Sequence, residues 1–324
     1  MNLKVSLGAV LILTAGLASA ANADWAPSKP LTIVVPFSAG GVNDIVTRAI
    51  ATRLSPLIGR PVIVENRTGA AGVLAMSSVA KSAPDGTTLI MGCSACLTIN
   101  PHLPATTMPI DPLTAFEPVT FVARSPLLLV ANPKLPVESL TDLVRLAKAQ
   151  PGKLSYGTIG AGSITHLAAA LLESSAGIKM LNVPYRGSGG GALTDAIGGQ
   201  VDVLFDAPET AGVQVKAGNL RLLGVTGDKR MPAWPDTPTI GESYPGYKVE
   251  LWFALLAPVE TPPDAVAYFN RHVRKILADP DFQTPFRERG LETIGSTPAE
   301  LHQIMKSDSE KWKRVIRDAN IAIK

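Results

Sequence analysis

The stretch LTIVVPFSAGGVNDIVTRAI, residues 31–50, decides the fold class of this chain. An apolar run, Leu31–Val35, ends at a proline, a loop with two adjacent glycines follows, and apolar residues at helical spacing continue to Ile50. A strand, a glycine loop and a helix in this order commonly cradle an anion, because the first N–H groups of a helix lack partners. The question is whether that anion is a phosphate or a carboxylate.

A nucleotide phosphate does not fit this loop. The dinucleotide fingerprint G-x-G-x-x-G is missing, since Gly40 is followed directly by Gly41 and then by Val42, and the P-loop pattern G-x-x-x-x-G-K-[ST] occurs nowhere in the chain. Two interpretations remain open. The glycines cradle a carboxylate, or they only tighten a turn while Asp44 caps the helix.

The first 23 residues have the pattern of an export signal. Lys4 precedes an apolar run, Val5–Leu17, that is shorter than the roughly 18 residues of a membrane span, and two A-x-A cleavage motifs follow. We therefore expect a signal peptide, 1–23, cleaved near Ala23, and a periplasmic protein.

The remaining chain, about 300 residues, exceeds the usual size of one hydrophobic core, which predicts two domains. Apolar runs alternate with helical stretches, a pattern typical of α/β domains with mainly parallel sheets flanked by helices. The expected strands are Leu31–Val35, Val62–Glu65, Thr88–Met91, Leu127–Val130, Leu154–Tyr156, Met180–Val183, Val201–Phe205 and Leu220–Val225. The expected helices include Asp44–Leu57, Val73–Ser82, Ile164–Ser174, Ala192–Gly198 and a last one from Pro298 to Ala319.

Two stretches, Glu117–Ser125 and Tyr247–Ala254, have the character of crossings between the domains. Two crossings build one domain from both ends of the chain, as in binding proteins that hold a ligand between hinged lobes. We expect one lobe to comprise 24–122 and 250–324, and the other to comprise 123–249.

Charge and composition argue against several classes of function. The net charge is only +3, and no basic stripe is interleaved with aromatic residues, so we expect no nucleic-acid partner. The four histidines form neither an H-E-x-x-H motif nor part of another ligand cluster, and a carboxylate-rich calcium loop is missing, so we expect no metal and no cofactor.

The loop GCSAC, residues 92–96, allows three interpretations. Ser94 lies in a near match to the G-x-S-x-G nucleophile elbow, and His166 is a conceivable base, which would make an exported serine hydrolase. Cys93 and Cys96 form a C-x-x-C motif that can close as a local disulfide in an oxidising compartment, although a redox context is missing. We favour the third interpretation, two small residues in a turn that lines a ligand.

The loop GTIGAGSITH, 157–166, is the second region rich in small residues after an expected strand. Ser163 stands at the expected N-cap of a helix, with Thr165 and His166 in its first turn. The two hydroxyls form a cup for a carboxylate or only cap the helix, and we favour the cup. His166 is equally compatible with ligand contact and with a bond to nearby backbone.

Two further charged residues follow expected strands. Arg186, in the loop YRGSGGGA, offers a charged fork to a carboxylate or points to solvent. Asp206 ends an apolar strand and would accept a hydrogen bond from a ligand amine or hydroxyl, or cap the next segment.

Over nearly its whole mature length, about Lys29 to Lys324, the chain resembles the Bug-type periplasmic solute-binding proteins of tripartite tricarboxylate transporters. The motifs that carry this resemblance are KPLTIVVPFSAGGVNDIVTRAIA, VIVENRTGAAGVLA, APDGTTLIMG, INPHL, GSITHLA, VPYRGSGGGALTDAIGGQVDVLFD and AGNLRLLGVTGDKRMPAWPDTPTIGE. The resemblance implies a two-lobed Venus-flytrap receptor without catalytic activity. Such a monomer captures a small carboxylate through backbone N–H groups, hydroxyls and ordered water, and delivers it to membrane permease subunits. A ligand sensor for a signalling partner has the same fold and stays open as an alternative.

The resemblance also implies a set of ligand-binding residues from both lobes. They are Phe37, Ser38, Ala39, Gly40, Gly41, Asn43, Asp44 and Ser94 from the first lobe, and Ser163, Ile164, Thr165, Tyr185, Arg186, Gly187 and Asp206 from the second. The chain departs from the family pattern at Val42, where a third glycine is common, at both cysteines, and in the glycine run 189–191. These departures lie at or beside the expected pocket, so the ligand can differ from the better-known ligands of the family.

Overall fold

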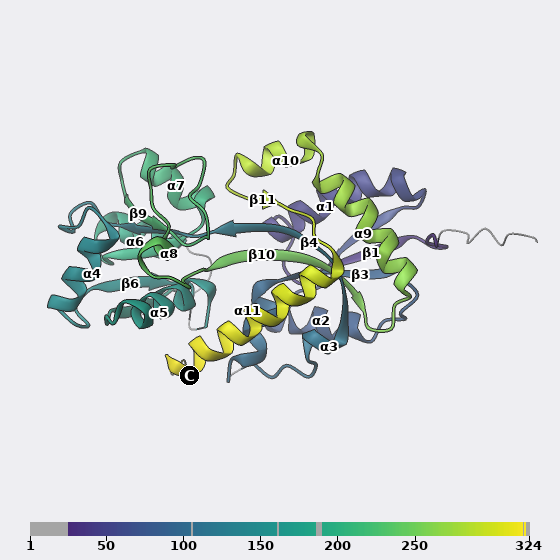
Figure 1. Cartoon of the computed structure of the whole chain (residues 1–324), viewed down its shortest axis with the longest axis horizontal. Coiled ribbons are helices and arrows are strands. Elements are labelled where there is room, and N and C mark those ends of the chain that lie inside the picture. Colours follow the sequence, from purple (N-terminus) through teal and green to yellow (C-terminus); the bar gives the residue numbers. More distant parts are fainter. Residues whose placement is uncertain (1–24, 105, 161, 186–189, 320, 322–324) are drawn as a thin grey trace, which may run out of the picture.

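The computed structural model describes residues 25–104, 106–160, 162–185, 190–319 and 321. Two lobes lie side by side, joined by the long strands β4 (Phe116–Pro126) and β10 (Glu250–Pro258), as Figure 1 shows. The predicted signal peptide lies outside the described residues. Within the part of the chain that is described, no helix is both long enough and apolar enough to cross a membrane.

The first lobe is built on a sheet of six strands in the order β11-β4-β10-β3-β1-β2. Its other strands are β1 (Leu31–Val35), β2 (Val62–Asn66), β3 (Thr88–Cys93) and β11 (Glu292–Thr293). Its helical segments are α1 (Val42–Ile58), the 3₁₀ turn η1 (Ala70–Gly72), α2 (Val73–Ala80), the π-helical turn η2 (Ala95–Ile99), the 3₁₀ turn η3 (Asn100–His102), α3 (Pro112–Ala115), α9 (Pro263–Leu277) and α10 (Pro280–Arg287).

The second lobe is built on a sheet of five strands in the order β7-β6-β8-β5-β9. These are β5 (Leu128–Ala131), β6 (Ser155–Thr158), β7 (Leu181–Pro184), β8 (Val203–Asp206) and β9 (Arg221–Val225). Its helices are α4 (Leu140–Ala149), α5 (Ile164–Ala176), α6 (Gly190–Gly198), α7 (Pro208–Lys216) and α8 (Ile240–Ser243). The last helix, α11 (Pro298–Asp318), contacts both lobes.

The prediction of α/β lobes with flanking helices is confirmed, but the prediction of mainly parallel sheets is wrong. β1 pairs in parallel with β2 and β3, and β6 pairs in parallel with β7 and β8. The pairs β10–β3, β10–β4, β11–β4, β5–β8 and β5–β9 are antiparallel. In the first lobe the antiparallel pairs come from the double crossing, since β4 leaves the lobe, β10 returns to it, and both lie to one side of the parallel set β3-β1-β2. In the second lobe they come from β5, which runs antiparallel to its neighbours β8 and β9.

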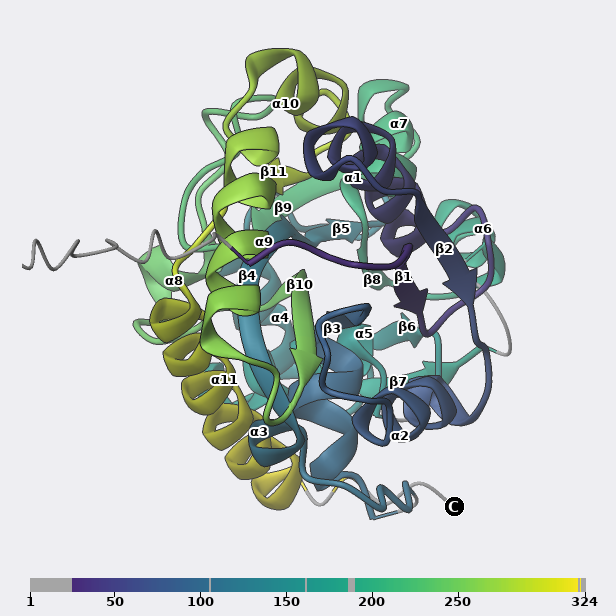
Figure 2. The same ribbon diagram turned by 90° about the vertical axis from the view of Figure 1, so that its right-hand side faces the viewer.

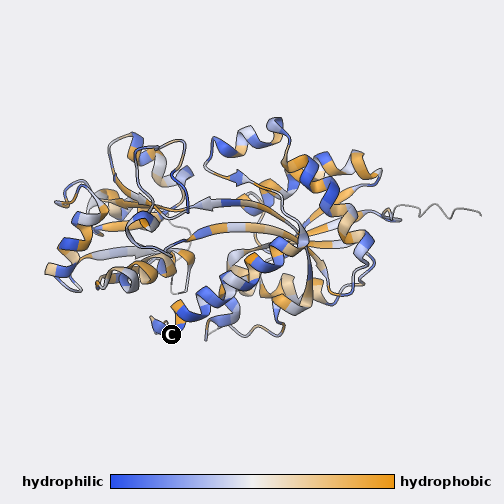
Figure 3. Ribbon diagram, in the orientation of Figure 1, coloured by the Kyte–Doolittle hydropathy of each residue, from blue (hydrophilic) through white to orange (hydrophobic). Residues whose placement is uncertain are grey.

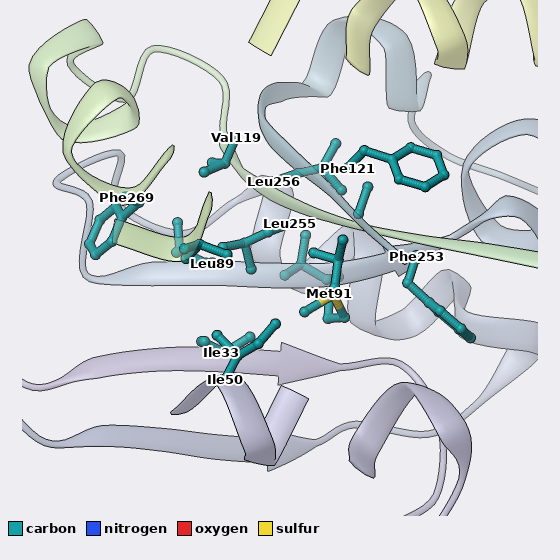
Figure 4. Packing of buried hydrophobic residues seen from close by; sticks show 14 of the residues in the cluster. Ile33, Ile50, Leu89, Met91, Val119, Phe121, Phe253, Leu255, Leu256 and Phe269 are labelled. Carbon is teal, nitrogen blue, oxygen red and sulfur yellow. The ribbon is translucent and has the colours of Figure 1, made fainter. Parts of the chain in front are cut away.

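The core of the first lobe lies between its sheet and the helices α1, α2 and α9. On α1, Val46, Ile50, Leu54 and Ile58 recur every fourth position and are buried, so the helix presents one apolar stripe to the sheet. Figure 4 shows Ile50 against the strand residues of this core, and Figure 3 shows that apolar residues concentrate on the strands of both lobes.

Helix α11 runs along both lobes, as Figures 1 and 2 show. Leu301 and Met305, in its first half, belong to the core of the first lobe, whereas Trp312 and Ile316 belong to the core of the second. The helix begins with a capping box, because the hydroxyl of Thr297 accepts from the backbone N–H of Glu300, whose carboxylate accepts from the N–H of Thr297. α11 therefore ties the lobes together on the side opposite to α7 and α10.

A second contact between the lobes lies at Gly290, in the turn between α10 and β11. The residue has a φ of +78°, and a Cβ built there would lie 2.7 Å from Cβ of Pro208 at the start of α7 and 3.3 Å from Cε of Met231. Only a residue without a side chain allows this approach of the two lobes.

We expect Gly290→Ala to destabilise the protein and to alter the separation of the lobes. Strain at positive φ costs about 1–2 kcal/mol, and the overlap with Pro208 adds about 1–3 kcal/mol. Gly246→Ala is the matched control, since Gly246 has a φ of +91° and no atom of the described residues lies within 4 Å of the place that a Cβ would take. Chemical unfolding and small-angle scattering check this. Equal losses of stability in the two variants, with unchanged scattering, would contradict the contact.

Candidate ligand-binding site

The first candidate region is the loop between β1 and α1. Pro36 is buried, Phe37 is half-buried, and Ser38 to Gly41 are exposed. Gly40 has a φ of +85°, which turns the chain into the helix, and Gly41 is the N-cap without a side-chain cap. The first N–H groups of α1 therefore have no intrahelical acceptor and carry the partial positive charge of the helix terminus.

Asp44 holds this loop in shape from within. Its Oδ2 accepts a hydrogen bond from the N–H of Gly40 at 2.9 Å, Nε of Arg48 donates to both carboxylate oxygens at 3.0 Å, and Nδ2 of Asn66 donates to Oδ1 at 2.9 Å. Nδ2 of Asn66 also lies 3.0 Å from the carbonyl oxygen of Phe37. The side chain of Asp44 is thus occupied by the protein and is a brace of the loop.

Burial by itself raises the pKa of Asp44, but the bonds from Arg48, Gly40 and Asn66 and the charge of Arg48 outweigh it, so the pKa lies below its ordinary value. Neither Arg48 nor Asn66 was expected at this loop from the sequence. The signal for Arg48 was its position four residues after Asp44 on the same helix. Asn66 ends a strand parallel to β1, and polar residues at that edge meet the loop.

Asn43 and Ser94 lie where the parallel neighbours β1 and β3 end, at one edge of the sheet. Nδ2 of Asn43 donates to the carbonyl oxygen of Met91 at 3.1 Å, and Asn43 is only 4% exposed. Among the described residues, neither Oδ1 of Asn43 nor Oγ of the fully buried Ser94 has a hydrogen-bond partner. Buried polar atoms nearly always have a partner, so these two atoms retain unused hydrogen-bonding capacity at this edge of the sheet.

The two cysteines beside Ser94 are free thiols with their sulfur atoms 3.1 Å apart. Both are buried, and burial raises the pKa of Cys96 well above its ordinary value. Ser94 has φ −48° and ψ −42°, ordinary helical values, whereas a nucleophile elbow is sharply strained. His166 belongs to the other lobe and bonds through Nδ1 to the N–H of Gly162. Among the described residues, no side chain is hydrogen-bonded to Oγ of Ser94, so no base is placed to activate this hydroxyl.

The second candidate region is the start of α5. Ser163 is the N-cap, and its Oγ accepts from the N–H of His166 at 3.3 Å, as predicted. That Oγ also lies 2.7 Å from the carbonyl oxygen of Gly160 and 3.0 Å from Oγ1 of Thr165. Oγ1 of Thr165 in turn accepts from the N–H of Ile159 at 3.2 Å. The hydroxyls therefore form one connected cluster at the start of the helix, with Ile164 half-buried beside it.

Tyr185 follows β7 and Asp206 ends β8, the two strands that flank β6. The hydroxyl of Tyr185 donates to Oδ2 of Asp195 at 2.5 Å, and burial together with this carboxylate raises its pKa to about 12. Asp206 is half-buried and accepts from Oγ1 of Thr210 at 2.7 Å, and burial raises its pKa despite this bond. The predicted residues Arg186 and Gly187 lie outside the described residues.

The structure thus gathers the predicted residues into two groups, one per lobe. The first group lies at the carboxyl ends of β1 and β3, and the second at the carboxyl ends of β6, β7 and β8, which are joined by parallel pairing through β6. Among the described residues, no hydrogen bond or ion pair joins the groups. A cavity of about 670 Å³ between the lobes is lined by α7, the loop 227–234 and the α10–β11 turn, and contains none of the predicted residues.

Two lobes with mixed sheets, crossed twice by the chain and carrying polar loops at the strand ends, have the architecture of binding proteins that hold a ligand between hinged lobes. The chain belongs to the tripartite tricarboxylate transporter receptor family, since the model described as "Tripartite tricarboxylate transporter family receptor" matches residues 46–321. This confirms the predicted resemblance. The family consists of periplasmic solute-binding receptors and not of enzymes, so the serine hydrolase is set aside.

Named relatives cover almost the entire chain. Protein BugT of Bordetella pertussis is 34% identical over 320 residues, covering 97% of each chain. The R. palustris protein Rpa4515, solved with adipate, is 36% identical with a TM-score of 0.76, covering 91% of this chain and 99% of its own. MatC of Rhodopseudomonas palustris, solved with bound malate, is 31% identical with a TM-score of 0.72, covering 90% of this chain and 99% of its own.

We expect Asp44→Asn to lower the free energy of unfolding at pH 7 by about 1–3 kcal/mol, because it removes the charged acceptor of three side-chain and backbone donors. The folded pKa of Asp44 lies below 3.8, so this stabilisation is complete above pH 3.8 and is lost as the pH falls through the lowered pKa. Chemical unfolding from pH 7 to pH 3 measures it. Asp236→Asn, at an exposed residue, is the control. A difference between wild type and Asp44→Asn that does not shrink in acid would contradict the brace.

Proposed function

We propose that the chain binds a small organic dicarboxylate between its two lobes and delivers it to membrane permease subunits. The single observation that carries the proposal is the pair of buried polar atoms, Oγ of Ser94 and Oδ1 of Asn43, that have no partner among the described residues. They lie at the sheet edge where the uncapped start of α1 also lies. A ligand carboxylate accepts from the hydroxyl and the helix N–H groups, and a water or ligand hydroxyl donates to Asn43.

The relatives support this class of ligand. Rpa4515 was solved with adipate and MatC with malate, both dicarboxylates, and both proteins share more than 30% identity with this chain. A second carboxylate group gives the ligand one charged end for each lobe.

The free energy of binding requires contacts from both lobes. One helix terminus contributes roughly 0.3–1 kcal/mol toward holding an anion, whereas micromolar affinity needs about 8 kcal/mol. The guanidinium of Arg48 is already paired with Asp44, so neutral donors supply most of the first-lobe contacts. We therefore propose that the hydroxyl cluster of Ser163 and Thr165 binds the other carboxylate. Arg186, which directly follows Tyr185 in the sequence, is proposed to belong to the same second-lobe group. The lobes are proposed to be 24–122 with 250–324, and 123–249.

A thermal-shift screen tests the proposed function on protein refolded without ligand. Succinate, malate and adipate are the probes, with acetate and citrate as shorter and more highly charged comparisons. A ligand that binds only the native state at 100 times its Kd stabilises it by about 2.7 kcal/mol. A rise in Tm with at least one dicarboxylate supports the proposal, and no rise with any of them overturns it.

Ser94→Ala is expected to weaken dicarboxylate binding about 10- to 150-fold, the value of one hydrogen bond to a charged group. The stability of the ligand-free protein should stay the same or rise, because the hydroxyl has no partner among the described residues. Ser77→Ala is the matched control, since Oγ of Ser77 on α2 is also buried without a partner there. Isothermal titration calorimetry measures both variants. An unchanged Kd in Ser94→Ala would remove Ser94 from the site.

Asp206 is proposed to accept a hydrogen bond from a ligand hydroxyl. Succinate and malate differ only in that hydroxyl, so they form a matched pair of probes. We expect Asp206→Asn to bind succinate about tenfold more tightly than wild type, because a like charge in a partly buried site is removed. The preference for malate should shrink in the same variant. Equal effects on both ligands, measured by titration, would place Asp206 away from the hydroxyl.

Delivery to a permease, rather than to a sensor, is tested by the partner that the loaded protein retains. Membranes solubilised from the host are passed over the immobilised protein with and without malate. Recovery of a polytopic permease supports transport, and recovery of a sensor kinase overturns it. Size-exclusion chromatography checks the proposed monomeric state.

A further inference from the structure

Helix α11 carries a partly buried carboxylate halfway along its length, between the half that packs on the first lobe and the half that packs on the second. Asp308 is 12% exposed at its side chain, and four donors surround it. Its Oδ2 accepts from Oγ1 of Thr98 at 2.7 Å, from Nε1 of Trp252 at 3.0 Å and from Nε1 of Trp312 at 3.1 Å. Its Oδ1 accepts from Nζ of Lys311 at 2.6 Å.

Two of the donors, Lys311 and Trp312, lie on α11 itself, and the other two come from other parts of the molecule. Thr98 lies on the turn η2, which follows Ser94 of the candidate site. Trp252 lies on β10, one of the two strands that cross between the lobes. Trp312 is fully buried in the core of the second lobe. One carboxylate therefore joins the candidate site, the crossing strands and the second lobe.

The hydroxyl of Thr98 has two acceptors within hydrogen-bond distance. Its Oγ1 lies 2.7 Å from Oδ2 of Asp308 and 2.8 Å from the carbonyl oxygen of Ser94. A hydroxyl has a single proton, so it donates to only one of these acceptors at a time. The charged carboxylate is the stronger acceptor. A ligand that moves Ser94 changes the distance to its carbonyl oxygen and thereby changes this competition.

A cavity lies beside Asp308 on the side of the crossing strands, so the side chains that line it have room to move. This cavity of about 600 Å³ is lined by Asp308, Trp252 and Lys311 together with Arg124 and Lys248. Nζ of Lys311 lies 4.2 Å from the ring centre of Trp312 and donates to the carbonyl oxygen of Lys248 at 3.1 Å, just before β10. A side chain of α11 thus contacts the backbone just before a crossing strand begins.

We propose that Asp308 is a positioning residue that couples the Ser94 turn to the crossing strands and to the second lobe through Thr98, Trp252 and Trp312. Ligand contact at Ser94 and the arrangement of the lobes then form one linked equilibrium. The inference rests on the proposed function for its ligand, but the network itself is present without ligand. Asp308 does not touch the ligand and acts through Thr98 alone on the site.

The test uses Asp308→Asn, Thr98→Val, the double variant, and Glu310→Gln as a control that removes an exposed carboxylate from the same helix. Without ligand, hydrogen exchange at the amides of residues 95–99 should speed up at least about fivefold in both single variants. It should stay at the wild-type rate in Glu310→Gln. Unchanged exchange in Asp308→Asn overturns the inference, whether or not any dicarboxylate binds.

With malate and adipate as probes, each single variant should bind about 5- to 150-fold more weakly than wild type. The double variant should bind no more weakly than the weaker-binding single variant, because both substitutions break the same link. The change of tryptophan emission on ligand addition should shrink in Asp308→Asn and persist in Glu310→Gln, a readout that loss of stability alone does not give. Additive losses of affinity, or a wild-type Kd in Asp308→Asn, overturn the coupling.

The two proposals fail in different ways. If wild type shows no thermal shift with any dicarboxylate, the proposed function fails, and the exchange measurement still decides whether Asp308 holds the Ser94 turn. If wild type binds and Asp308→Asn binds equally well, the proposed function stands and the coupling fails.

Discussion

The antiparallel pairing of β4 with β10 is the constraint on which the rest of the structure depends. Nine residue pairs hold the two strands together from Glu250–Pro126 to Pro258–Phe116, with register shifts between Phe253 and Ala254 and between Leu255 and Leu256 of β10. Because the chain crosses from one lobe to the other along β4 and returns along β10, the lobes are joined by two strands that are hydrogen-bonded to each other rather than by a flexible linker. Arg124 on β4 adds ion pairs to Glu292 of the first lobe and to Asp228 before β10.

The double crossing also explains where the candidate ligand-binding residues lie. It leaves each lobe with its own short set of parallel strands, β1 with β2 and β3, and β6 with β7 and β8. The carboxyl ends of parallel strands meet at one edge, so each lobe presents one edge of loops and helix starts. In the first lobe the edge is stiffened by Asp44, and its two unpartnered buried atoms among the described residues are Oδ1 of Asn43 and Oγ of Ser94. The same edge is linked through Thr98 and Asp308 to α11, so ligand contact and lobe arrangement share one polar network.

Much of the fold was predictable because its signals are local. All eight expected strands are present, and their ends differ from the predicted ends by at most two residues. The N-cap role of Ser163 followed from residue type and spacing. The stretches 117–125 and 247–254 were recognised as crossings, but their pairing with each other was not. Pairing direction depends on where the chain travels between two strands, and no window of sequence contains that information. Hence the expectation of mainly parallel sheets was wrong.

The sequence alone determined the alternation of strands and helices, the glycine loop before α1, the hydroxyls at the start of α5 and the family resemblance, because each depends on residues close together in the chain. Tertiary structure decided the roles of the individual side chains. The carboxylate of Asp44 braces the loop because Asn66 approaches it from a neighbouring strand, and a ligand contact of Asp44 stays a prediction. Thr98 and Asp308 are separated by 210 positions and meet only because α11 returns across both lobes. Contacts of that kind arise from the packing of whole lobes, so the physical reason for them lies in the assembled cores and not in any local pattern.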